Sequence, residues 1–132
     1  MGAQGRQGLG TELKGQTMTT TFIKTGDCRK TKVQGAGEVA EILNRELCGA
    51  QNVLGMLRWL RAGERLQAGA EKGSHQLIYL MDGQGVITLD AKDYEVGKGA
   101  GIYLGPNEQA TVRHVGGAPL KLFHLVVPKL AS

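Results

Sequence analysis

Histidine is the side chain best suited to proton transfer near neutral pH, and this chain contains three histidines, His75, His114 and His124. His114 is our first candidate for a catalytic acid or base. Glu71 is the second, because a desolvated carboxylate can act as a general base. A structural interpretation stays open for both: His114 as a core histidine with a buried hydrogen bond, and Glu71 as an exposed side chain.

Other reactive motifs are missing from the sequence. It contains no phosphate-binding loop, serine-nucleophile elbow or nucleotide fingerprint. Cys28 and Cys48 form no CxxC pair and have no histidine at metal-binding spacing, which favours two reduced thiols. The N-terminal residues do not resemble a secretion signal, and no apolar run is long enough to cross a membrane. The sequence therefore predicts a cytoplasmic protein with no membrane partner.

Short apolar runs separated by glycine-marked turns indicate the elements that must position these side chains. Glycine makes up 21 of the 132 residues, which favours many tight turns and an all-β fold. Apolar runs of strand length begin at residue 53 and recur toward the C-terminus. The runs are 53–60, 75–81, 85–90, 94–96, 101–104, 110–115 and 120–127. Asp82-Gly83 predicts a hairpin after the second run, and the whole pattern predicts a sandwich or barrel.

The segment before these runs divides into two parts. Residues 1–17 are rich in glycine and poor in large apolar side chains, so we expect a flexible leader followed by one domain over residues 18–132. Apolar residues at helical spacing, with Gly49 as a C-cap, predict a short helix near residues 38–48.

The spacing of glycines after residue 62 resembles the first motif of the cupin superfamily. In that motif a glycine precedes H-x-H, a glutamate and a second glycine. Gly63 and Gly83 match the two glycines, and the ligand positions between them hold Gly69, Glu71 and Gln76. In the second motif, Gly99 matches the glycine and Ala110 stands at the histidine position. The resemblance implies a double-stranded β-helix, or jelly-roll, barrel.

Cupins that bind iron, manganese, nickel or zinc use three histidines and one glutamate at these positions. Here Gly69 and Ala110 carry no donor atom, Gln76 is neutral, and only Glu71 is a good ligand. We therefore expect no bound metal and no other cofactor.

The resemblance also suggests a ligand pocket. It places Gln76 on the inner face of the barrel, where Gln76 and Tyr103 would orient a ligand. His124 lies on the apolar face of the last run, and Trp59 is suited to stacking on a flat ligand. A core or interface role is open for Trp59 and Tyr103, and a structural role for His124.

Two arginines near residue 60 bear on the kind of ligand. Arg58 and Arg61 are three residues apart on a predicted strand, so at most one of them faces inward. An inward arginine would suggest a carboxylate or phosphate ligand. The formal charge of +4 is not arranged as a basic stripe, so no nucleic-acid partner is expected.

These observations predict a small-molecule-binding cupin. If the protein is an enzyme, they favour metal-independent proton transfer by an isomerase, cyclase or lyase. One alternative is a metal-dependent dioxygenase or isomerase with the displaced ligands Glu71, His75 and His114, which requires a bulge that turns His75 inward. The other is a non-catalytic ligand sensor or accessory protein. The resemblance also implies a homodimer.

Overall fold

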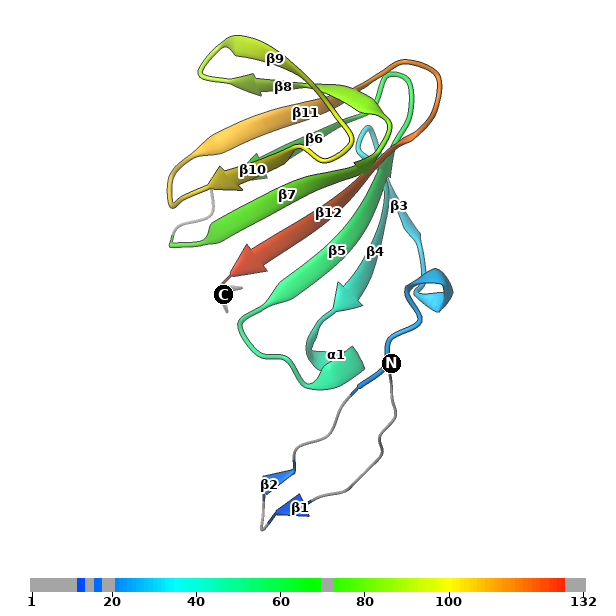
Figure 1. The fold of residues 1–132 in the computed structure, drawn as a ribbon, viewed down its shortest axis with the longest axis vertical. Helices are drawn as coiled ribbons and strands as arrows, with labels where there is room; N and C mark the ends of the chain where they lie inside the picture. The colour runs from blue at the N-terminus through cyan, green and yellow to red at the C-terminus, as the bar shows by residue number, and fades with distance from the viewer. Residues whose placement is uncertain (1–11, 14–15, 18–20, 70–72, 128–132) are drawn as a thin grey trace.

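The computed structural model describes residues 12–13, 16–17, 21–69 and 73–127, and most of its strands form two antiparallel sheets (Figure 1). The larger sheet has the order β10-β7-β12-β5-β4-β3, and the smaller has the order β6-β11-β8-β9. The larger sheet comprises β3 (Thr31–Val33), β4 (Gly37–Leu43), β5 (Leu54–Leu60), β7 (His75–Asp82), β10 (Gly101–Leu104) and β12 (Leu120–Val127). The smaller sheet comprises β6 (Arg65–Gly69), β8 (Gln84–Leu89), β9 (Lys92–Gly97) and β11 (Gln109–Val115). This is the jelly-roll barrel that the sequence predicted.

The hydrophobic core lies between the two sheets. Alternate residues of each strand point into it, as the period of two requires. The larger sheet contributes Leu60, Ile78, Leu80, Leu104, Leu120 and Leu122, and the smaller contributes Leu66, Ala68, Ile87, Ala110 and Val112. Strands of both sheets supply these side chains. Removal of their apolar surface from water therefore holds the two sheets together.

The predicted helix near residues 38–48 is confirmed only in its last turn. Residues 37–43 form strand β4, which pairs with β3 on one side and β5 on the other. Helix α1 (Arg45–Cys48) begins after Asn44, whose Oδ1 accepts a hydrogen bond from the Leu47 N–H at 2.8 Å, and ends at Gly49 with φ 75°. Ladder hydrogen bonds on both sides of β4 override the local helical spacing of its apolar residues.

The hairpin predicted at Asp82-Gly83 is wrong, because the chain passes there from one sheet to the other. Strand β7 belongs to the larger sheet and β8 to the smaller. Gly83 has a φ of 89°, and a Cβ at this position would lie 2.6 Å from the Pro119 carbonyl oxygen. The sequence signal identified a turn that requires glycine, but it does not fix which strands pair. Strand β6 was not predicted.

Most of the predicted leader lies outside the described residues. Within residues 1–17, strand β1 (Glu12–Leu13) pairs with β2 (Gln16–Thr17), and the division into leader and domain stays a prediction. The 3-10 helix η2 (Thr25–Asp27) precedes β3. In the described ranges, no helix has the length and apolar character needed to span a membrane.

Candidate functional site

Three polar side chains are linked across the inner face of the larger sheet. Arg58 on β5 donates from Nε to His124 Nδ1 on β12 at 3.1 Å. His124 Nε2 lies 2.7 Å from Gln76 Oε1 on β7. Because β7, β12 and β5 are neighbours in the sheet, this polar chain, Arg58–His124–Gln76, joins residues that are distant in sequence.

Strand alternation explains why these side chains point inward. Along β12, Leu120, Leu122, His124 and Val126 are buried in turn. Gln76 opens the same pattern on β7, and His124 and Gln76 are each 4% exposed. The other buried residues of β7 and β12 are apolar. Gln76 and His124 are therefore the polar side chains that these two strands bury inside the barrel.

The hydrogen bonds fix the tautomer and charge of His124. Arginine has only N–H donors, so Nδ1 of His124 accepts and its proton resides on Nε2, which donates to Gln76. Burial, and to a smaller extent the nearby Arg58 charge, together lower the pKa of His124 from 6.5 to about 4. His124 is therefore neutral at physiological pH.

The polar chain has more donors than its protein partners use. Arg58 also contacts Met56 Sδ through Nη2 at 3.5 Å, and burial lowers the pKa of its guanidinium. In the part of the chain that the structure describes, Arg58 has no carboxylate partner and the Gln76 Nε2 amide has no acceptor. Buried donors normally have partners, so these N–H groups are free to bond with a molecule other than the described part of the chain.

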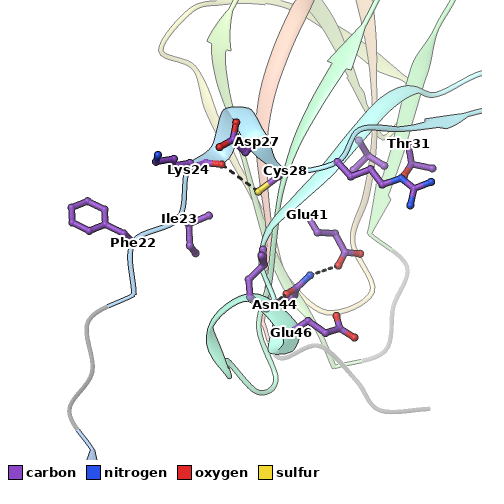
Figure 2. A pocket seen from close by; sticks show the side chains of 12 residues that line it. Phe22, Ile23, Lys24, Asp27, Cys28, Thr31, Glu41, Asn44 and Glu46 are labelled. Carbon is purple, nitrogen blue, oxygen red and sulfur yellow. Dashed lines mark hydrogen bonds between the residues drawn. The ribbon is translucent and has the colours of Figure 1, made fainter.

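A pocket of about 680 Å³ lies beside strand β4, the neighbour of β5, and its lining does not include Arg58, His124 or Gln76 (Figure 2). Its floor includes Val39 and Glu41 of β4, which lie directly opposite Arg58 and Met56 of β5. The segment around η2 and helix α1 form its walls. The remaining lining residues are Phe22, Ile23, Lys24, Asp27, Cys28, Arg29, Thr31, Asn44, Glu46 and Leu47. The volume is in the range of small-molecule sites.

The two predicted catalytic residues are not part of the polar chain. His114 shares the inner face of β11 with Ala110 and Val112, but it lies beside the β11–β12 loop and its Nε2 contacts the Ala118 carbonyl oxygen at 2.8 Å. Gln76 pairs with Val126 near the opposite end of β12. Glu71 lies outside the described residues.

The two aromatic candidates lie on the outer face of the larger sheet. Tyr103 is opposite Leu77, and its hydroxyl contacts His75 Nδ1 at 2.6 Å. Trp59 lies beneath two ammonium groups, Lys30 Nζ at 4.3 Å and Lys121 Nζ at 5.8 Å from the ring centroid. Of the four predicted pocket residues, the structure brings together Gln76 and His124. It adds Arg58, for which the only sequence signal was that at most one of Arg58 and Arg61 faces inward.

The residues at the cupin ligand positions do not fit a metal ion. A Cβ at Gly69 would lie 2.0 Å from the Glu108 carbonyl oxygen, and Ala110 has no donor. Gln76 Oε1 is engaged by the His124 N–H. Among the described residues there is no group of three or more His, Cys, Asp or Glu placed to hold a metal.

The displaced metal-ligand set is also not assembled. His75 is on the outer face, paired with Tyr103, and no bulge turns it inward. His114 is inside, at the end of the barrel distant from Gln76.

A jelly-roll barrel with a buried polar cluster on its inner face defines a cupin-type, small-molecule-binding protein. Residues 62–129 match the family described as the AraC-like ligand binding domain. The chain belongs to this family.

One protein of similar sequence and three solved structures resemble this chain. An uncharacterised protein of Methanocaldococcus jannaschii is 37% identical over 49 residues, which cover 37% of this chain and 39% of that relative, less than two thirds of its length. A predicted oxalate decarboxylase of Thermotoga maritima superposes with a TM-score of 0.70 at 17% identity, covering 81% of this chain and 98% of that one. The polyketide cyclase RemF of Streptomyces resistomycificus has a TM-score of 0.69 at 14% identity, covering 86% and 88%. KdgF of a Halomonas species has a TM-score of 0.71 at 11% identity, covering 85% and 96%. These structural likenesses establish the fold.

Proposed function

We propose that this protein is a non-catalytic cupin that holds a small polar organic molecule at the Arg58–His124–Gln76 chain, without a metal ion. The observation that carries this proposal is the polar chain itself, placed in an apolar barrel with donors left over. Polar groups are costly to bury unless they are hydrogen-bonded, so a bound molecule with acceptor atoms would stabilise them. The family description, a ligand binding domain, agrees with this role.

The environment of His124 favours binding over proton transfer. A general base needs a free lone pair, but Nδ1 already accepts from Arg58. A general acid needs an accessible acidic proton, but the neutral ring donates its N–H to Gln76. The isomerase, cyclase or lyase activity considered from the sequence therefore has no support from His124. The residues at the cupin metal-ligand positions give no support to a metal-dependent activity.

A fragment screen by NMR tests the proposal on the full chain. A library of small polar organic molecules should give binders that shift the His124 ring N–H and the Gln76 side-chain amide signals. Gln76→Leu should weaken these binders by about tenfold, the effect of losing one or two hydrogen bonds to a buried ligand. Gln67→Leu, which alters an exposed glutamine on β6, is the matched control and should bind as the wild type does.

Two outcomes would overturn the proposed function. One is that no library member binds. The other is that the binders shift signals only around the pocket of Figure 2 and bind Gln76→Leu unchanged. Release of a chemically altered fragment would instead restore the enzymatic alternative.

We also infer that the protein is a homodimer, formed through the outer face of the larger sheet. Leu77, Tyr79 and Tyr103 are exposed there on neighbouring strands β7 and β10, an apolar surface suited to a second copy. Sedimentation velocity should give twice the chain mass, and Tyr79→Ser should shift the mass toward a monomer. A wild-type monomer at all accessible concentrations would contradict this inference. The cytoplasmic location and the absence of a nucleic-acid partner stay predictions.

A further inference from the structure

The geometry points to a small organic acid as the ligand, with its carboxylate on Arg58 and a second acceptor oxygen on the Gln76 amide. This inference rests on the proposed function, because it names the ligand class of the same site. Three features of the polar chain carry it.

The first feature is the charge of Arg58, which has no counter-ion among the described residues. The ion pairs in the described ranges join Arg61 to Glu38 and Arg113 to Asp93, and neither involves Arg58. Of the five N–H donors of a guanidinium, one contacts His124 and one contacts the Met56 sulfur. A half-buried cation is costly without a partner, and a carboxylate matches the remaining donors in a bidentate arrangement.

The second feature is the Gln76 amide group. Its oxygen accepts from His124, but its NH₂ group is buried without an acceptor among the described residues. A buried donor is destabilising if it stays unpaired. The imidazole of His124 separates this donor from Arg58, so a ligand that satisfies both carries two acceptor groups.

The third feature is the arrangement of Glu41, an acid on the same face of the neighbouring strand β4. Glu41 lies opposite Met56, one strand beyond the polar chain. Its Oε1 accepts from Asn44 Nδ2 at 2.7 Å, beside helix α1 (Figure 2). Glu41 is therefore held by Asn44 and forms no ion pair with Arg58, whose cross-strand neighbour on β4 is Val39.

Paired fragments test this inference on the full-length protein. Each pair is a carboxylic acid and its primary amide, chosen to carry a second carbonyl or hydroxyl oxygen. We expect the acids to bind at least about tenfold more tightly than the amides, as a charge-assisted hydrogen bond provides. Arg58→Met should abolish this preference. Arg61→Met, which alters the exposed arginine paired with Glu38, should retain it.

A second measurement does not depend on the folding of a variant. An acid on Arg58 would offset the charge that helps to lower the His124 pKa, so saturating wild-type protein with the acid should raise that pKa. The amide should not change it. The ¹⁵N shifts of the His124 ring followed against pH report this difference.

The outcomes separate the two ideas. Equal binding of acids and amides, or an acid preference that persists in Arg58→Met, overturns the organic-acid inference and leaves the proposed function standing. An unchanged His124 pKa with bound acid also overturns it. No binding of either fragment class overturns the proposed function together with the inference.

Discussion

Gly69→Ala is expected to destabilise the protein by about 4 kcal/mol or more, and Gly69→His is expected to prevent folding rather than to restore a metal ligand. Gly69 has a φ of 98°, and a Cβ there would lie 2.0 Å from the Glu108 carbonyl oxygen and 2.9 Å from the Gln109 Cα. Both neighbours are backbone, at the point where β6 pairs with β11. The strand pair would have to separate to admit any side chain.

Gly99→Ala is the matched control for this prediction. Gly99 has nearly the same φ, 95°, but no heavy atom lies within 4 Å of its Cβ position. Its substitution should cost only the positive-φ penalty of roughly 1 to 2 kcal/mol. Urea unfolding of the two alanine variants checks the difference, which equals the cost of the close backbone approach. Equal stabilities would show that the chain at Gly69 relaxes freely and would make a side-chain ligand at this position feasible.

The sequence predicted much of the fold because two signals are local. The alternation of apolar residues set which face of β7 is buried, and Gln76, Ile78 and Leu80 indeed point inward. Glycine positions located turns such as Gly83 and Gly99, both with positive φ. The pairing of strands is not local, which is why the Asp82-Gly83 turn was assigned to a hairpin.

The candidate site was harder to predict, because it depends on contacts between three strands. Gln76 followed from its motif position and His124 from its place on an apolar face. The hydrogen bond between His124 and Gln76 requires β7 and β12 to be neighbours, and no local sequence pattern specifies this pairing. Arg58 is the clearest example. Alternation allows at most one of Arg58 and Arg61 to face inward, and the role of Arg58 appears only once His124 is placed beside it.

The stability of the protein is expected to fall as the pH is lowered from 8 to 5, and part of this fall should come from His124. The pKa of His124 is about 4 in the folded state against about 6.5 in the unfolded chain, because burial and then the Arg58 charge disfavour the imidazolium. The other groups that face the ring, Met56, Gln76 and Ile78, carry no charge. Between pH 6.5 and 4 the unfolded chain therefore binds more protons than the folded one, so acid favours unfolding in that window.

Linkage gives this contribution as roughly 2 kcal/mol at pH 5, approaching about 3 kcal/mol below pH 4. Urea unfolding at pH 5, 6 and 8 should show the loss in the wild type, and His124→Gln should remove this part of the pH dependence even if it lowers stability at every pH. His75→Gln, which alters the outer-face histidine bonded to Tyr103, is the control and should retain the dependence. Arg58→Met should reduce it without abolishing it, since burial is the larger cause of the shift and the Arg58 charge the smaller. Parallel stability curves for the wild type and His124→Gln between pH 8 and 5 would mean that the imidazole is protonated in the folded barrel, and the assignment of Nδ1 as the acceptor from Arg58 would then be wrong.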